Sequence, residues 1–165
     1  MSAALSNGQN KIFLATSSGK AITFSQNDVR AMGRTAAGVR GIRLAGDDHV
    51  VGMEILSEAS EISILTVTAN GYGKRSLVSD YRQQGRGGLG LITIKASERN
   101  GPVIGVFQVV DEDELMLMTN TGRIIRTRVK EIRVIGRNTQ GVKLIGIDPD
   151  EEVTDVARLD EKDDE

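Results

Sequence analysis

The sequence predicts an all-β, propeller-like fold that consists of three repeats with four strands in each. The first observation is a register of glycines, because Gly19, Gly71 and Gly122 lie 52 and 51 residues apart. Two further sets keep the same intervals: Gly33, Gly85 and Gly136, and Gly38, Gly90 and Gly141. The second observation is that short apolar runs separated by glycine turns recur in each repeat, as in stacked blades of sheet. Because only 3% of the 165 residues are aromatic, the core must be aliphatic.

Each repeat opens with an apolar run of five residues, at 12–16, 64–68 and 115–119. A run this short also fits one turn of a buried helix, but the turn pairs Ser18-Gly19, Asn70-Gly71 and Thr121-Gly122 favour a strand followed by a hairpin. The second strand alternates in the third repeat, where Arg126 and Arg128 interrupt apolar positions. Such alternation is typical of a half-buried strand.

Two more strands are expected in each repeat. The third strands are predicted at 39–44, 91–95 and 142–147, and shorter fourth strands at 50–53, 103–106 and 153–156. Four strands are the usual number in a propeller blade. The blades then span about 11–60, 61–112 and 113–158, between a disordered leader at 1–10 and an acidic tail at 159–165.

Three blades leave two open ends, since propellers generally close with four to eight blades. Two arrangements satisfy these ends: the chain is part of a longer one, or two copies complete each other. Self-association through the open blade ends is therefore one expectation.

The net charge of −2 conceals a separation of charge along the chain. Residues 146–165 carry a net charge of −8, and the other 145 residues carry +6. Many basic residues fall on the second strand and on the turn that follows it, so stacked repeats would bring them into one stripe that binds a polyanion through its phosphates. The predicted DNA contacts are Lys20, Arg30, Arg34, Arg40, Arg43, Lys74, Arg75, Arg82, Arg86, Lys95, Arg123, Arg126, Arg128, Arg137 and Lys143.

An arginine follows the first glycine of a turn in every repeat, in Gly33-Arg34, Gly85-Arg86 and Gly136-Arg137. The glycines alone are explained by a tight turn with positive φ. A turn needs no guanidinium at a fixed position, so the arginines favour phosphate contacts. Duplex DNA is the favoured ligand, because single-strand binding uses stacking aromatic residues.

The sequence predicts no catalytic activity, cofactor or metal site. His49 is the only histidine and there is no cysteine. The acidic run 111–114 is expected to be a solvated loop, and neither Tyr72 nor Tyr81 has the neighbours of an activated nucleophile. With no apolar stretch of membrane length and no signal peptide, a cytoplasmic location is expected.

Five segments resemble the C-terminal domain of the bacterial DNA gyrase A subunit: 29–33, 38–44, 70–75, 126–128 and 134–142. The resemblance covers about residues 11–158. It implies a six-bladed β-pinwheel, in which neighbouring blades exchange strands and a basic rim wraps duplex DNA so that the enzyme can introduce negative supercoils. The chain would then supply three of the six blades, as the C-terminal half.

The resemblance also implies partners and a location. The partners would be duplex DNA, the remaining blades and the N-terminal domain of the gyrase A subunit, and the gyrase B subunit, in the nucleoid of a bacterial cytoplasm. The family's catalytic tyrosine lies in another domain. In the segment that is most similar to the family's signature box, 84–90, Gly85 and Leu89 replace basic residues, so the box itself is expected in an earlier blade.

Two alternatives to this function are kept. One is the equivalent domain of topoisomerase IV, and the other is a propeller-like scaffold for protein interactions.

Overall fold

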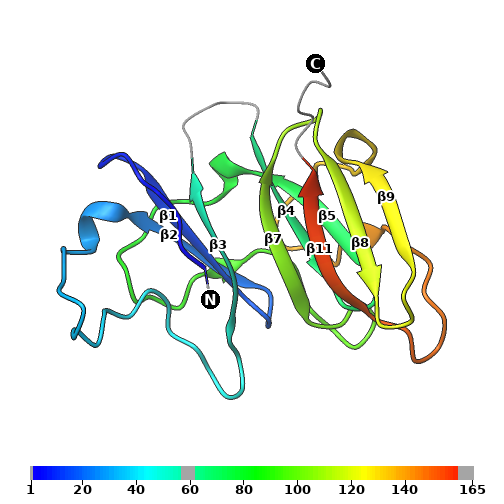
Figure 1. The fold of residues 1–165 in the computed structure, drawn as a ribbon, viewed down its shortest axis with the longest axis horizontal. Helices are drawn as coiled ribbons and strands as arrows, with labels where there is room; N and C mark the ends of the chain where they lie inside the picture. The colour runs from blue at the N-terminus through cyan, green and yellow to red at the C-terminus, as the bar shows by residue number, and fades with distance from the viewer. Residues whose placement is uncertain (1, 57–61, 160–165) are drawn as a thin grey trace.

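The computed structural model describes residues 2–56 and 62–159, and Figure 1 shows three sheets side by side along the molecule. Most of the acidic tail predicted at 159–165 lies outside the described residues. The first sheet has the order β3 (Val50–Leu56), β1 (Lys11–Thr16), β2 (Lys20–Ser25) and β6 (Leu91–Ile92). The second has the order β7 (Val103–Val109), β4 (Ser63–Thr68), β5 (Tyr72–Leu77) and β10 (Val142–Lys143). The third consists of β11 (Val153–Leu159), β8 (Glu114–Thr119) and β9 (Ile124–Arg128).

Each repeat has one short 3₁₀ helix directly after its second strand. These helices are η1 (Gln26–Asp28), η2 (Val78–Asp80) and η3 (Val129–Glu131). All pairs of neighbouring strands in the three sheets are antiparallel. The all-β, propeller-like fold class is therefore confirmed. No helix in the described ranges has the length and apolarity that a bilayer crossing requires.

The repeats exchange strands. By sequence β6 belongs to the second repeat, but it pairs with β2 of the first, with Lys20 opposite Ile92 and Ala21 opposite Leu91. In the same way, β10 of the third repeat pairs with β5 of the second. Of the three predicted third strands, those of the second and third repeats thus form over two residues each, at the edge of the preceding sheet. Residues 39–44 contain no strand, because no preceding sheet lies beside them in the described chain.

The apolar core fills the space between consecutive sheets. Phe13 and Ala15 of β1 pack with Ile64 and Val103 between the first two sheets, and a second cluster fills the space between the second and third sheets. The Phe13 and Tyr81 rings meet edge to face, 5.1 Å apart, which is a favoured aromatic geometry. Because these two clusters each take side chains from two sheets, neighbouring blades share most of their core, and a smaller cluster of Ile22, Phe24 and Ile42 lies within the first repeat.

Candidate nucleic-acid interface

The fifteen predicted basic residues separate into three groups by burial. Lys74 and Arg75 are buried, and Lys20, Arg86 and Arg137 are half-buried. The other ten are exposed: Arg30, Arg34, Arg40, Arg43, Arg82, Lys95, Arg123, Arg126, Arg128 and Lys143. The structure therefore does not bring all fifteen onto one face.

Lys74 lies wholly inside the protein, where its ammonium group has three acceptors. Its Nζ donates to the carbonyl oxygens of Gly136 (2.8 Å) and Arg137 (2.7 Å) and to the Ser76 hydroxyl (2.9 Å). Burial, together with the nearby Arg137 charge, lowers the pKa of Lys74 to about 8. This lysine holds the Gly-Arg turn of the third repeat against β5.

Arg75 follows on the same strand and is also committed to internal contacts. Its Nε donates to the carbonyl of Ile132 at 2.8 Å, and its guanidinium forms an ion pair with Asp111. The main chain of Arg75 donates to Arg133 and accepts from Ile135, so a segment of the third repeat covers this strand. The cover explains why an arginine on a predicted half-buried strand is only 5% exposed.

The second and third Gly-Arg turns direct their arginines to the main chain of the preceding repeat. Arg86 donates to the carbonyls of Asp28 (3.0 Å) and Arg40 (2.6 Å). Arg137 donates to the carbonyl of Ile92 at 2.8 Å, and its guanidinium lies 5.6 Å from the centre of the Tyr81 ring. The repeated arginine thus has a role in joining the blades. Both guanidinium groups retain further N–H donors, since each carries five.

A row of three exposed arginines occupies one position of the repeat. Arg30, Arg82 and Arg133 lie 52 and 51 residues apart, and each is the second residue after its 3₁₀ helix. All three are exposed, and within the described ranges no side-chain hydrogen bond or ion pair engages them. We call these three residues the arginine row. Arg133 is not among the predicted DNA contacts. The intervals of 52 and 51 residues that separate the turn glycines nevertheless assign it to the same repeat position as Arg30 and Arg82.

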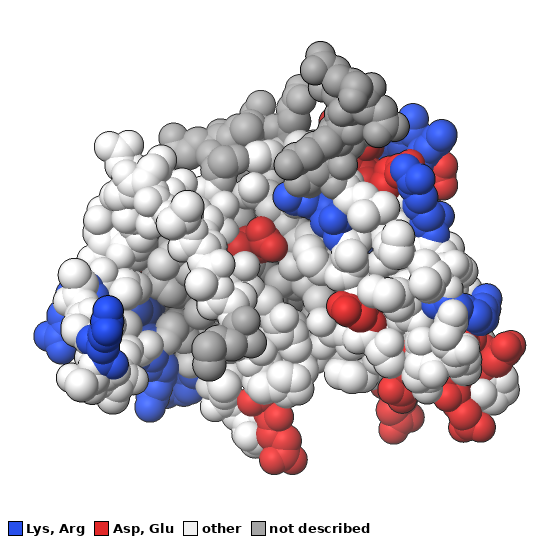
Figure 2. All heavy atoms as spheres, in the orientation of Figure 1, with Lys and Arg blue, Asp and Glu red and all other residues white. Residues whose placement is uncertain are grey.

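Two further groups of exposed cations lie at opposite ends of the molecule. Arg34, Arg40 and Arg43 belong to the long segment after η1, where blue atoms gather at the lower left of Figure 2. At the other end, Arg126 and Arg128 of β9 share the Glu114 carboxylate, with 3.8 Å between Arg128 Nε and a Glu114 oxygen. An ion pair within the protein lowers the charge that these two offer to a phosphate.

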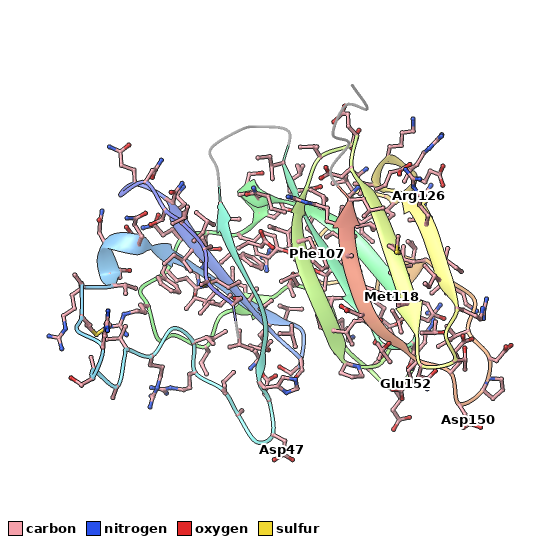
Figure 3. All side chains as sticks on the ribbon, viewed as in Figure 1. Asp47, Phe107, Met118, Arg126, Asp150 and Glu152 are labelled. Carbon is pink, nitrogen blue, oxygen red and sulfur yellow. The ribbon has the colours of Figure 1, made fainter. Side chains whose placement is uncertain are left out.

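Three exposed acidic side chains, those of Asp47, Asp150 and Glu152, lie along the lower edge in Figure 3. Beside them, Glu151 is buried and accepts hydrogen bonds from Thr119, Thr121 and Arg123. The hydrogen bond from Thr121 and those from the Asp148 amide and Thr119 lower the pKa of Glu151 to about 2. The ends of the hairpins opposite these turns carry both signs of charge, because Asp28, Asp80 and Glu131 are exposed two residues before the members of the arginine row.

Asp48 occupies the position in the first repeat that Glu151 holds in the third. Burial alone would raise the pKa of Asp48, but hydrogen bonds from Ser18 and Ser17 outweigh it and bring the pKa down to about 2. The Ser18 hydroxyl lies 2.6 Å from one Asp48 oxygen, and the Ser17 hydroxyl lies 2.8 Å from the other. Both carboxylates fasten a hairpin turn to the loop before the last strand of the repeat. They are structural groups and are occupied by internal donors.

Residues 10–57, 63–109 and 113–160 each match the family of the DNA gyrase C-terminal domain, which is described as a beta-propeller. The DNA gyrase A subunit of Salmonella typhimurium is 50% identical over 157 residues, which are 95% of this chain and 18% of that protein. The A subunit of Escherichia coli DNA gyrase is 45% identical over 161 residues, 98% of this chain and 18% of that one. The chain thus spans less than a fifth of the length of these relatives.

Two solved structures have the same fold. The C-terminal domain of a DNA topoisomerase IV superposes with a TM-score of 0.88 at 25% identity, covering 94% of this chain and 48% of that one. A DNA gyrase A C-terminal domain superposes with a TM-score of 0.83 at 26% identity, covering 92% of this chain and 51% of that one.

Proposed function

The chain belongs to the DNA gyrase C-terminal domain family, and from this premise we propose that it is a non-catalytic module that binds duplex DNA with little sequence preference. In the complete protein, such binding would wrap DNA and support negative supercoiling. The observation that carries the proposal is the arginine row: Arg30, Arg82 and Arg133 repeat with the blades, and their side chains have no partner among the described residues.

Electrostatics support duplex binding through the phosphates. An exposed, unpaired arginine gains more from a phosphate than one that already shares a carboxylate, and each phosphate contact releases condensed counterions. The helices of the described chain are three residues long, so none of them has the length to read bases in a major groove. Contacts to phosphates without base contacts give binding that tolerates any sequence.

The predicted basic residues take different parts in this proposal. Other exposed residues, such as Arg34, Arg40, Arg43, Lys95 and Lys143, would add phosphate contacts outside the arginine row. Lys74 and Arg75 would act indirectly, because they fix the segments that carry Arg133 and Arg137. The partners of the complete protein would be the rest of the gyrase A subunit and the gyrase B subunit, in the bacterial nucleoid.

The test measures binding of a fluorescent linear duplex by anisotropy over a series of salt concentrations. Replacing the arginine row by alanine, in Arg30→Ala with Arg82→Ala and Arg133→Ala, is expected to weaken binding strongly at low salt. It should also reduce the slope of log K against log salt by about three, since each lost phosphate contact contributes about 0.9. Unchanged affinity and slope in the triple variant would contradict the proposal.

A matched pair of single variants controls for the loss of charge. Arg82 and Arg99 are both exposed arginines of the second repeat, but Arg99 lies at the hairpin-turn end, where it stacks 5.1 Å over Tyr72. Arg82→Ala should weaken DNA binding and Arg99→Ala should change it much less. Equal effects would mean that net charge, and not the arginine row, determines binding.

The superposition on a topoisomerase IV domain favours a second candidate, in which the chain serves the equivalent region of that enzyme. The identity of 45–50% to gyrase A subunits supports the first candidate. Grafting the chain in place of the matching region of a gyrase A subunit separates the two. Negative supercoiling by the hybrid is the result expected of a gyrase domain.

A further inference from the structure

The same triplet of residues lies at the end of each 3₁₀ helix. It consists of an acid, an apolar or aromatic residue, and a member of the arginine row. The triplets are Asp28-Val29-Arg30, Asp80-Tyr81-Arg82 and Glu131-Ile132-Arg133, and in each of them the acid is the last residue of the helix. The acids therefore lie 52 and 51 residues apart, as the arginines do.

The backbone places the acid and the arginine of a triplet side by side. The residue between them is extended, with φ of −112°, −102° and −88° and ψ of 105°, 90° and 124° in the three repeats. Tyr81 and Ile132 are buried, whereas the acids and arginines on either side of them are exposed. In an extended chain, residues i and i+2 point to the same side, with about 7 Å between their Cα atoms. A carboxylate thus accompanies each arginine of the row.

The three acids take no part in the internal contacts of the described chain. No ion pair or side-chain hydrogen bond among the described residues engages their carboxylates. They differ in this from Asp48 and Glu151, whose oxygens accept from internal donors. They also do not cap the helices, because a serine hydroxyl caps η1 and the side chains before η2 and η3 make no cap hydrogen bond. Internal structure therefore does not account for an acid at this position of every repeat.

The sign of the charge changes along the chain on either side of the arginine row. An acid stands two residues before each member of the row, and four residues after it stands the arginine of a Gly-Arg turn, which is Arg34, Arg86 or Arg137. Arg34 is exposed, and Arg86 and Arg137 keep guanidinium donors beyond those that join the blades. A polyanion on the row is therefore attracted on one side and repelled on the other.

We propose that Asp28, Asp80 and Glu131, which we call the acid row, determine on which side of the arginine row the DNA lies. This inference rests on the proposed function. The carboxylates repel phosphates and confine the duplex to the side of the Gly-Arg turns, so that the path is the same on every blade. Like-charge repulsion of this kind gives specificity at a cost in affinity.

The short range of the repulsion limits this role to the acid row. At physiological salt the Debye length is about 8 Å, so a carboxylate about 7 Å from an arginine acts on the phosphate that this arginine holds. Asp47, Asp150 and Glu152 are exposed at the hairpin-turn end, and their side chains have no partner among the described residues. A strand of five or six residues, about 17–20 Å long, separates that end from the 3₁₀ helices. These three acids have the same charge as the acid row and differ from it in position.

Neutralising the acid row tests the repulsion. Asp28→Asn with Asp80→Asn and Glu131→Gln should strengthen the binding of a fluorescent linear duplex about tenfold at low salt, since one carboxylate at this distance weakens it about two- to threefold. The gain should shrink as salt is added. The matched control is Asp47→Asn with Asp150→Asn and Glu152→Gln, which changes the net charge equally and should alter affinity much less. Equal gains in the two triple variants, or no gain in the first, would overturn the proposal.

Photo-crosslinking tests the path of the DNA, since the chain has no cysteine of its own. Ser79 and Gln83 are both exposed, and they lie on opposite sides of Arg82 along the chain. With a short photo-crosslinker attached to the new thiol, Gln83→Cys should crosslink to duplex DNA and Ser79→Cys should not. Neutralising the acid row should bring Ser79→Cys to the level of Gln83→Cys. Equal crosslinking from the two positions while the acid row is intact would exclude the one-sided path.

The same titrations distinguish failure of this inference from failure of the proposed function. If the unaltered chain does not bind duplex DNA, or if the triple alanine variant of the arginine row binds as well as the unaltered chain, both are wrong. If the arginine row is required but the two triple acid variants behave alike, only the role of the acid row is wrong. Circular dichroism should show that every variant is folded, because the substituted acids are exposed and make no internal contact among the described residues.

Discussion

The guanidinium of Arg137 donates a 2.8 Å hydrogen bond to the main-chain carbonyl of Ile92. This contact connects all three repeats, because Arg137 lies in the third, Ile92 belongs to the second, and β6, which contains Ile92, completes the sheet of the first. A side chain that the sequence predicts to bind phosphate is thus also a clamp between blades. Replacing an arginine that makes such an internal contact, and separately one that does not, therefore distinguishes effects on stability from effects on DNA binding.

Arg137→Ala is expected to lower the free energy of unfolding by about 1–3 kcal/mol, because it removes a charge-assisted hydrogen bond and a contact with the Tyr81 ring. Urea denaturation followed by circular dichroism measures the change. Arg133→Ala is the control, since its exposed side chain has no partner among the described residues, and it should leave stability unchanged. Equal stability of the two variants would show that the Arg137 contact does not hold the blades together.

The glycine register predicts the number of repeats and their hairpins, because tight turns constrain the residue type directly. It does not predict that β6 and β10 cross into the preceding sheets, which only the resemblance to the family implies. Strand alternation records which faces are buried, but it does not specify which neighbour supplies the hydrogen bonds. For the same reason the sequence places Arg75 at the surface, since the segment that covers it comes from the next repeat.

The arginine row is only partly predicted by the sequence. Arg30 and Arg82 belong to the predicted basic stripe, whereas Arg133 follows a strand whose own arginines already supply the basic positions of the third repeat. The register of 52 and 51 residues contains the missing information, because equivalent residues of a repeat share one environment. Which arginines have internal acceptors depends on main-chain carbonyls, which carry no signal in the sequence.

Acid is expected to weaken the third hairpin through Glu151. The pKa of Glu151 is about 2 in the folded protein and 4.5 in its ordinary state, so the unfolded chain binds a proton first as the pH falls. The stabilisation is complete above pH 4.5 and is lost as the pH falls toward 2. Thermal unfolding across this window should show a steeper loss of stability in the wild type than in Glu151→Gln. Glu152→Gln, at an exposed neighbour, should keep the wild-type profile.

Gly141→Ala is expected to destabilise the joint between the second and third repeats. The added methyl group would lie 2.8 Å from the Gly73 carbonyl oxygen, and the residue has a φ of 79°. The backbone conformation alone costs a residue with a side chain about 1–2 kcal/mol, and the contact adds to that cost. Gly46→Ala is the matched variant, because Gly46 has a φ of 56° and open space around it. If Gly141→Ala lowers the thermal unfolding temperature by no more than Gly46→Ala does, the close approach of Gly141 to the Gly73 carbonyl is contradicted.

Lys74→Met tests whether the buried ammonium group stabilises the contact between β5 and the third repeat. Methionine fits an aliphatic position, since the equivalent residues of the other repeats are Ile22 and Ile125, but it leaves the carbonyls of Gly136 and Arg137 without their donor. Each unsatisfied buried acceptor costs about 1–3 kcal/mol, so urea denaturation should show a loss of about 2 kcal/mol or more.

The control for Lys74→Met is Lys143→Met, which removes an exposed lysine of the third repeat and should leave the free energy of unfolding unchanged. DNA binding should respond in the opposite order under conditions where both variants are folded. Lys143→Met removes a candidate phosphate contact, while the Lys74 ammonium is enclosed by protein acceptors and has none to offer. A folded Lys74→Met variant that binds DNA more weakly than Lys143→Met does would contradict this order.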